Sequence, residues 1–324
     1  MKSLSRRQLL GLPAAALLAG AVPATARDRF PARQVTILVG FAPGGGGDIS
    51  ARFIADFLRE RWKVQVVVEN RPGAGATIAA AQLARAKPDG YTVALATTSP
   101  FTVAPNFQTV QYDAAKDFTY LFQFLVSAQP LFVRNDSPHR TWQDLVAWAR
   151  ANPGKLNWST AATNGGPHIA AEAAFRHLGI SGQYIPYKGG AEASVALLGG
   201  QIDALVAAEF AQFVASGQVR LLAETGPDKL PEFPSLPTFK ELGMPLSVPI
   251  FYGIAAPAGV PADVIAAWED AAQDMMKAAS FRDLMGKLKS TASYQGHREF
   301  SATLATVLRE MARLIPALGF KRTP

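Results

Sequence analysis

The chain has 324 residues, no cysteine and a formal net charge of +7, from 32 Lys or Arg and 25 Asp or Glu. The lack of cysteine excludes disulfides, thiolate nucleophiles and cysteine-based metal sites, and the length suffices for one large or two smaller domains. Because the basic residues are spread along the chain, we expect no nucleic-acid partner, and the mild positive charge suits a small anionic ligand.

The N-terminal residues form an export signal. The pair Arg6 and Arg7 precedes the short apolar stretch 9–18, and a run of small residues ends at Ala26. Paired arginines are typical of the bacterial twin-arginine export route. The apolar stretch is shorter than the ~20 residues that a membrane span needs, so we favour a signal over an anchor. We predict a signal peptide over residues 1–26, cleaved after Ala26, and a mature periplasmic protein that is not embedded in the membrane.

Short apolar strands alternate with amphipathic helices along most of the chain, which is typical of an α/β fold with mainly parallel sheets. The predicted strands, in chain order, cover residues 35–41, 64–69, 91–97, 156–159, 184–187 and 204–208. The predicted helices cover residues 48–62, 75–86, 141–151, 167–178, 191–198, 262–278 and 298–314.

Two extended segments, 122–133 and 248–256, do not fit this alternation. We expect both to be strands that cross between two lobes, the first leaving the N-terminal lobe and the second returning to it. The first lobe would then comprise residues 27–128 and 250–324, and the second lobe residues 129–249. This predicts two mainly parallel sheets flanked by helices, with a ligand cleft between the lobes at the ends of the strands.

A glycine loop, Gly44 to Gly47, lies between the first predicted strand and the helix that follows it. The free backbone N–H groups of such a loop and helix start can hold an anion. A nucleotide phosphate loop is excluded, because Asp48 and Ile49 stand where it needs lysine and a hydroxyl residue. A dinucleotide loop matches only in part, because Ile49 replaces its third glycine.

The third hypothesis for this loop is direct binding of a carboxylate by the backbone N–H groups of Gly45, Gly46 and Gly47. We expect Asp48 to be the helix N-cap, with its carboxylate turned onto the N–H groups of the first helical turn. A tight turn between strand and helix that binds nothing explains the same residues equally well.

Short motifs along the mature chain carry a family resemblance. In chain order they are VGFAPGGGGD (39–48), VENRPGAG (68–75), KPDGYT (87–92), IPYKGG (185–190), LLGGQID (197–203), LPT (236–238), ELG (241–243) and AAPAG (255–259). The ordered set resembles the Bug family, the substrate-binding proteins of tripartite tricarboxylate transporters. The resemblance implies a two-lobed, type II-like periplasmic binding protein that closes on a small carboxylate, with a membrane permease as its partner.

The resemblance also implies where the ligand binds. In the family, backbone N–H groups from a loop of each lobe hold one carboxylate, and variable residues contact the rest of the ligand. The matching residues of the first lobe are Phe41, Gly45, Gly46, Asp48, Thr98 and Ser99. Those of the second lobe are Asn164, Gly165, His168, Lys188 and Gly189.

Two segments depart from the family pattern and concern the far end of the ligand. Residues 207–210 stand where the family often has an Asp-Asn pair, and residues 160–164 contain less glycine and serine than is usual. Within the first segment, Glu209 could meet a ligand amine, but we expect it to be solvated, as most acids are. The four histidines lack metal-ligand spacing, so we expect no metal and no cofactor.

An exported α/β enzyme that acts on a small carboxylate is the alternative function. Such an enzyme needs a nucleophile beside a base, or paired carboxylates in the cleft. The chain has no Gly-x-Ser-x-Gly motif, and the acid beside the glycine loop, Asp48, has a capping role. We therefore predict a monomeric, non-catalytic solute-binding protein that captures a mono-, di- or tricarboxylate for uptake through a permease or for a sensor.

Overall fold

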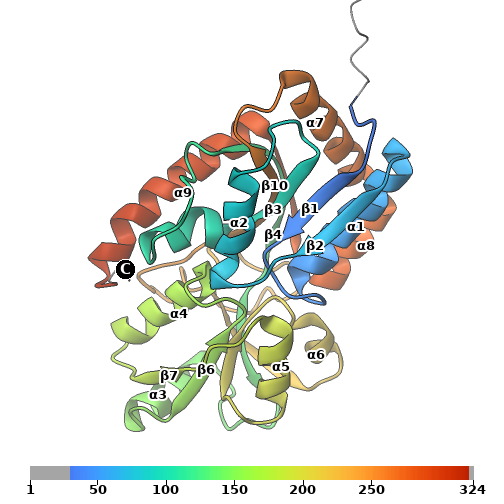
Figure 1. Ribbon diagram of the computed structural model, residues 1–324. Coiled ribbons are helices and arrows are strands. Elements are labelled where there is room, and N and C mark those ends of the chain that lie inside the picture. Colours follow the sequence, from blue (N-terminus) through green and yellow to red (C-terminus); the bar gives the residue numbers. More distant parts are fainter. Residues whose placement is uncertain (1–29, 321–324) are drawn as a thin grey trace, which may run out of the picture.

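The computed structural model describes residues 30–320, so the signal peptide predicted for residues 1–26 lies outside the described part of the chain. The chain forms two α/β lobes, one above the other in Figure 1, each built around one sheet. Among residues 30–320, no helix combines the length and the apolar character that a bilayer crossing requires.

The first lobe contains a six-stranded sheet in the order β11-β4-β10-β3-β1-β2. Its strands are β1 (Val35–Val39), β2 (Val66–Asn70), β3 (Thr92–Thr97), β4 (Phe118–Ser127), β10 (Ile250–Pro257) and β11 (Thr291–Gly296). Strand β1 pairs in parallel with β2 and β3. Strand β10 runs antiparallel between β3 and β4, and β11 runs antiparallel to β4.

The second lobe contains a five-stranded sheet in the order β7-β6-β8-β5-β9. Its strands are β5 (Pro130–Arg134), β6 (Leu156–Thr160), β7 (Gly182–Tyr184), β8 (Ala204–Val206) and β9 (Val219–Glu224). Strand β6 pairs in parallel with β7 and β8, whereas β5 runs antiparallel to β8 and β9.

Helices cover both sheets (Figure 1). Those of the first lobe are α1 (Gly46–Trp62), α2 (Thr77–Ala84), α7 (Ala262–Lys277), α8 (Ala279–Leu288) and α9 (His297–Ala317), with the short turns η1 (Ala74–Ala76), η2 (Ser99–Val103) and η3 (Ala104–Asn106). Those of the second lobe are α3 (Trp142–Ala151), α4 (Gly166–His177), α5 (Gly190–Leu198) and α6 (Ala211–Ala215). Thr141 caps α3, because Thr141 Oγ1 accepts the N–H of Asp144 and the Asp144 carboxylate accepts the N–H of Thr141.

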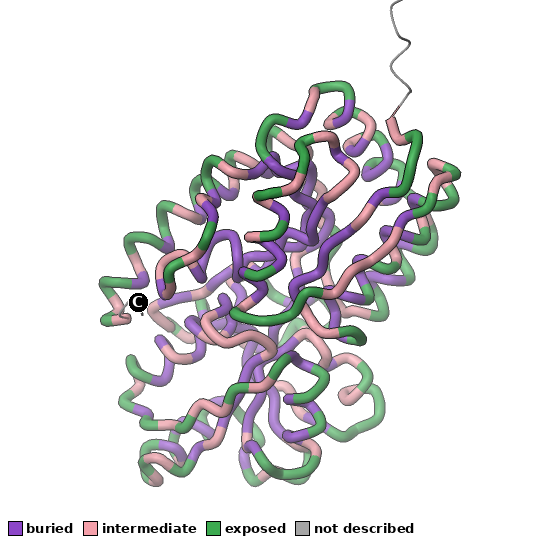
Figure 2. The backbone as a smooth tube through the Cα atoms, in the orientation of Figure 1, coloured by how far each residue is buried: buried purple, intermediate pink, exposed green. Residues whose placement is uncertain are grey.

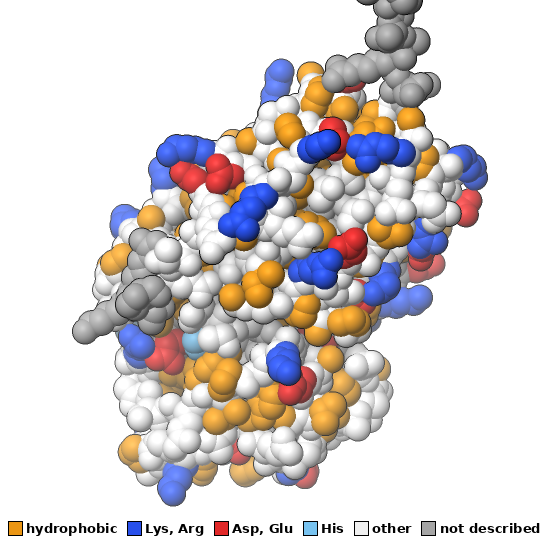
Figure 3. Space-filling view, viewed as in Figure 1, with side chains coloured by type: hydrophobic (Ala, Val, Ile, Leu, Met, Phe, Trp, Pro, Cys, Tyr) orange, Lys and Arg blue, Asp and Glu red, His pale blue; other side chains and the backbone are white. Residues whose placement is uncertain are grey.

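The first sheet is buried on both faces. Alternate residues of a strand point to opposite faces, so Ile37 packs into the core that α1 and α7 share, while Leu38 packs into the core beneath α2 and α9. Such double burial requires continuous apolar strands, which is the pattern that β1 and β3 show in the sequence. In Figure 2 the buried backbone accordingly runs through the central strands, and the exposed backbone lies on the outer helices. On the face drawn in Figure 3, Lys and Arg side chains are scattered over the surface.

The predicted two-lobed α/β fold is confirmed, but the expectation of mainly parallel sheets is corrected, because both sheets are mixed. The antiparallel pairs all involve strands next to the crossings between lobes or at the C-terminal end of the chain. Strand β4 leaves the first lobe and continues through Ala128 and Gln129 directly into β5 of the second. The return is made by the segment between β9 and β10, and β10 then pairs within the first sheet.

Candidate functional site

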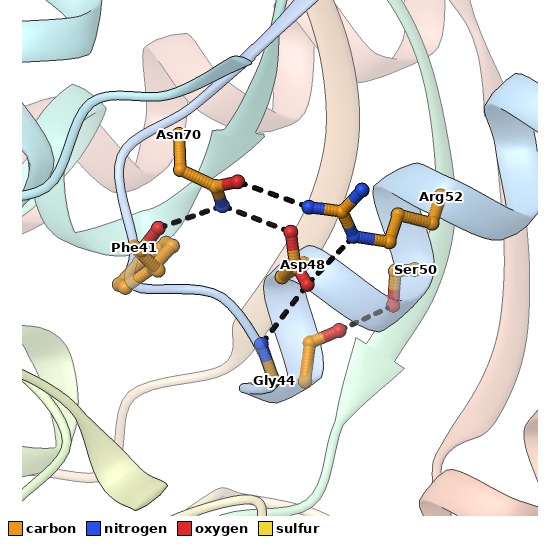
Figure 4. Close-up of polar contacts among 7 residues, drawn as sticks. Phe41, Gly44, Asp48, Ser50, Arg52 and Asn70 are labelled. Carbon is orange, nitrogen blue, oxygen red and sulfur yellow. Dashed lines mark hydrogen bonds and ion pairs between the residues drawn. The ribbon is translucent and has the colours of Figure 1, made fainter. Parts of the chain in front are cut away.

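The glycine loop lies at the lower edge of the first lobe, where β1 ends and α1 begins. Helix α1 starts at Gly46, with Gly45 as its N-cap, so the prediction that Asp48 is the N-cap is corrected. Asp48 is the third helical residue, and its carboxylate reaches back to accept the N–H of Gly44 at 3.0 Å (Figure 4). The loop is therefore fastened to its own helix by the Asp48 side chain.

Two further donors hold the same carboxylate. Asn70 Nδ2 donates to Asp48 Oδ1 at 2.9 Å and to the carbonyl oxygen of Phe41 at 3.0 Å, and Arg52 Nε donates to Asp48 Oδ2 at 2.9 Å (Figure 4). Burial by itself would raise the pKa of Asp48, but the hydrogen bonds from Arg52, Gly44 and Asn70 outweigh it and leave the pKa below its usual range. Asp48 is thus an ionised internal brace of the loop.

A cavity of about 280 Å³ lies between the two lobes, next to the glycine loop. The predicted site residues that line it are Phe41, Gly45, Gly46, Ser99, Lys188 and Gly189. Helix α1 of the first lobe and helix α5 of the second both begin at this cavity. The first-turn N–H groups of a helix lack intrahelical acceptors and carry partial positive charge, so both lobes present an anion-binding end to the same space.

The other predicted residues lie beside the cavity rather than in its lining. Thr98 Oγ1 donates to the carbonyl oxygen of Pro249 at 2.9 Å and accepts the N–H of Phe251 at 3.1 Å. Thr98 thereby joins the end of β3 to the returning strand. Gly165 is the N-cap of α4, and a Cβ built on it would lie 2.6 Å from Ser99 Oγ, so glycine permits a close approach of the two lobes there.

His168 and Asn164 form a small cluster behind the second-lobe loop. His168 Nδ1 accepts the N–H of Asn164 at 2.9 Å, and its ring lies against Trp158 and Tyr184. Burial lowers the pKa of His168 to about 4, so its imidazole is neutral at pH 7. Asn164 lines a second cavity of about 440 Å³, which adjoins the first at residues that the two share, namely Phe41, Ala42, Ala161, Ala162 and Lys188.

Glu209 is a site residue for which the expectation of a solvated side chain is corrected. It lies in the second lobe between β8 and α6 and lines the interlobe cavity. Its Oε1 atom accepts the N–H of Gly46 at 3.1 Å, so an acid of the second lobe occupies part of the anion-binding end of α1. Its Oε2 atom is buried and has no hydrogen-bonding partner among residues 30–320. Burial raises the pKa of Glu209, and the backbone N–H groups of Gly46, Glu209 and Ala208 oppose this rise only in part.

Motif reasoning missed three other residues of the cavity wall, Gln129, Ile250 and Tyr252. They lie where the chain crosses between the lobes, and the two predicted crossing segments already contained all three. The backbone N–H of Gln129 donates to both carboxylate oxygens of Glu224, at 3.1 and 3.2 Å, and the N–H of Gly226 donates at 2.9 Å. Burial raises the pKa of Glu224 to about 7. Among residues 30–320, no cluster of histidines and acids is placed to hold a metal ion.

The fold and the cleft define a two-lobed solute receptor. A model of the tripartite tricarboxylate transporter family receptor, TctC, matches residues 50–320. The chain belongs to this family, which confirms the family predicted from its motifs.

Relatives and solved structures agree with this assignment. The chain is 32% identical over 310 residues to a UPF0065 protein of Cupriavidus necator, covering 95% of this chain and 94% of that protein. It is 32% identical over 254 residues to BugT of Bordetella pertussis, covering 76% and 77% of the two chains. The structure of the periplasmic binding protein BugD matches with a TM-score of 0.84 at 29% identity, over 91% of this chain and 100% of BugD. A structure of Rpa4515 from R. palustris with adipate matches with a TM-score of 0.85 at 25% identity, over 91% and 100% of the chains.

Proposed function

We propose that this receptor captures a small organic carboxylate between its lobes. One observation carries the proposal. Gly45 and Gly47 line the cavity, and among residues 30–320 no group accepts a hydrogen bond from the backbone N–H of either glycine. Two free amides at a helix N-terminus suit a carboxylate. The adipate in the Rpa4515 structure supports the same ligand class.

The proposal also covers export of the protein, closure of its lobes and transfer of the ligand to a permease. The signal in residues 1–26 exports the chain to the periplasm, and lobe 1 (27–128 and 250–324) closes on lobe 2 (129–249) around the ligand. The receptor then passes the ligand to a membrane permease of the tripartite tricarboxylate type, a partner that the family name supports. The mass of the protein recovered from a periplasmic extract tests the cleavage after Ala26.

A thermal-shift screen with mono-, di- and tricarboxylates tests carboxylate capture. A carboxylate that binds the folded state raises the melting temperature as its concentration increases, without being converted. Turnover of a stabilising compound would contradict the receptor function, and a screen in which no carboxylate stabilises the protein would contradict the ligand class.

Replacing Gly46 by valine tests the role of the loop. A Cβ on Gly46 would lie 3.6 Å from Ala208 Cβ and from the Tyr252 hydroxyl, which is ordinary contact, so the fold should survive. The added methyl groups enter the cavity, and we expect at least a roughly tenfold loss of carboxylate affinity, or about 1.4 kcal/mol. Gly286→Val is the matched control, because Gly286 is an exposed glycine of α8 with open space around its Cβ position. Equal affinity of the two variants would remove the loop from the site.

A further inference from the structure

The carboxylate of Glu209 lies between the glycine-rich starts of two helices from opposite lobes. Its Oε1 atom accepts the N–H of Gly46 at the start of α1. Its Oε2 atom lies so close to Gly190, at the start of α5, that a Cβ there would be 2.0 Å away. The absence of a side chain at Gly190 makes room for the acid, and helix N-termini favour its ionised form. The carboxylate of Glu209 is therefore part of the cavity wall, and an opposite charge placed beside it favours its ionised form against the effect of burial.

The surrounding groups leave this charge without a cation. Lys188 lines the same cavity, but no ion pair joins it to Glu209 in the described part of the chain, and Lys188 is exposed. Glu192 also lines the cavity, and its carboxylate accepts the backbone N–H of Lys188 at 2.9 Å. Arg52, on α1, is paired with Asp48 instead. Because Lys188 and Glu192 are both exposed, Glu209 is the acid whose carboxylate oxygen is buried in this cavity wall.

A buried carboxylate with an unpartnered oxygen is costly unless a donor or an opposite charge meets it. A second carboxylate beside Glu209 adds like-charge repulsion in a poorly screened space, whereas an ammonium group adds attraction and donates hydrogen bonds. The free N–H groups of Gly45 and Gly47 still provide a place for one carboxylate. A carboxylate held there lies close to Glu209, since a Cβ on Gly45 would be only 3.1 Å from its Oε1 atom, and an ammonium group on the same ligand would offset this repulsion.

We infer that Glu209 is a specificity-determining residue that selects a small zwitterion, a carboxylate that also carries a protonated amine, over dicarboxylates and tricarboxylates. This inference rests on the proposed function, in which the glycine loop binds the ligand carboxylate. It assigns the ligand amine to Glu209, in the segment where the chain departs from its family pattern.

Matched probes separate the charges of the ligand. The panel consists of linear monocarboxylates of three to six carbons, their α-amino and ω-amino derivatives, and the corresponding dicarboxylates, titrated calorimetrically at pH 7. The wild-type protein should bind an amino derivative roughly tenfold or more tightly than the dicarboxylate of equal length. This difference is expected when the group beside Glu209 changes from a repelled carboxylate to an attracted ammonium. Equal or tighter binding of the dicarboxylates would overturn the inference.

Glu209→Gln tests whether this residue is the cause. The amide keeps the shape of the side chain and removes its charge, so the preference for the amine should fall by roughly tenfold. Glu192→Gln removes one charge from the same wall but leaves Glu209 in place, and it should retain the preference. An undiminished preference in Glu209→Gln, or an equal loss in both variants, would overturn the assignment to Glu209.

The panel also separates this inference from the proposed function. Binding of monocarboxylates and dicarboxylates without any gain from the amine would leave carboxylate capture intact and overturn only the role of Glu209. No binding by any probe, in the wild type and in both variants, would overturn carboxylate capture and the inference together.

Discussion

The brace formed by Asp48 offers the sharpest test of how the glycine loop is held. The variant Asp48→Asn keeps the size of a side chain that is only 4% exposed but removes its charge. The carboxylate accepts hydrogen bonds from Asn70 at Oδ1 and from Gly44 and Arg52 at Oδ2. The NH₂ group of the asparagine replaces one of these oxygens, so it must face either Asn70 or the pair Gly44 and Arg52, all of which are donors. Hydrogen bonds to charged groups contribute about 1.5–3 kcal/mol each, and the half-exposed Arg52 contributes much less, so we expect a loss of about 2.5 kcal/mol.

This loss should appear as a lower melting temperature. An unfolding entropy of about 2.1 cal/mol/K per residue, over the 291 residues from 30 to 320, gives about 0.6 kcal/mol/K, so the shift should be about 4 °C. Because the pKa of Asp48 is lower in the folded protein than in the unfolded chain, its ionised carboxylate stabilises the fold at neutral pH. This stabilisation is lost as the pH falls below 3.8, the pKa of the unfolded chain, and through the folded pKa. The difference between variant and wild type should therefore shrink in strong acid.

Asp56→Asn is the control for Asp48→Asn. Asp56 lies on the same helix and pairs with Arg59, but its side chain is 65% exposed, so its removal should change stability by less than about 0.5 kcal/mol. Scanning calorimetry measures both variants, and titration with a carboxylate that stabilises the wild type measures the effect on the loop. A melting temperature and affinity equal to those of Asp56→Asn would refute the idea that Asp48 holds the loop in its binding shape.

Three further predictions concern the core and the buried ionisable groups. Gly253→Ala places a Cβ 2.5 Å from the carbonyl oxygen of Phe122, within the backbone of the first sheet. The free energy of unfolding, measured in urea, should therefore fall by more than about 3 kcal/mol, and a fall below about 1 kcal/mol would contradict this close packing. The pKa of His168 is lowered to about 4, so the stability that its neutral ring contributes is complete above pH 6.5. This contribution falls by up to about 3 kcal/mol as the pH drops towards 4. The urea midpoints of His168→Asn should lack this pH dependence. The pKa of Glu224 is raised to about 7, so the stability that its protonated carboxyl contributes is complete below pH 4.5 and is lost as the pH rises to 7. Over this range the urea midpoint of Glu224→Gln should therefore decline less than that of the wild type.

Local patterns predicted most of the strands and helices but not β9, β11, α6 or α8, and they misplaced the cap of α1. Asp is a favoured N-cap, and Asp48 follows four glycines, so the cap rule selects it. The helix instead begins at Gly46, because Gly45 adopts the extended cap conformation without a side chain, and Asp48 reaches back from the third position. Both arrangements place the acid beside the loop, and only the three-dimensional path of the chain distinguishes them.

The direction of strands could not be read from periodicity, because apolar alternation is the same in parallel and antiparallel sheets. The order of the first sheet depends on β10 entering between β3 and β4, a pairing between segments more than 120 residues apart. The burial of Glu209 has the same origin. Its partner Gly46 is 163 residues away, and neither local sequence contains a sign that the lobes bring them together.

The bond between Gly46 and Glu209 also links the charge of the ligand to the closure of the lobes. It joins the two lobes, yet it brings an acid into a space where its second oxygen finds no partner. Closure without a ligand therefore gains one hydrogen bond and loses the hydration of a carboxylate. A ligand that presents a cation to Glu209 removes that cost only in the closed state, and a ligand can shift a conformational equilibrium only through such a difference in affinity. The zwitterion that Glu209 selects is thus also the ligand that favours closure.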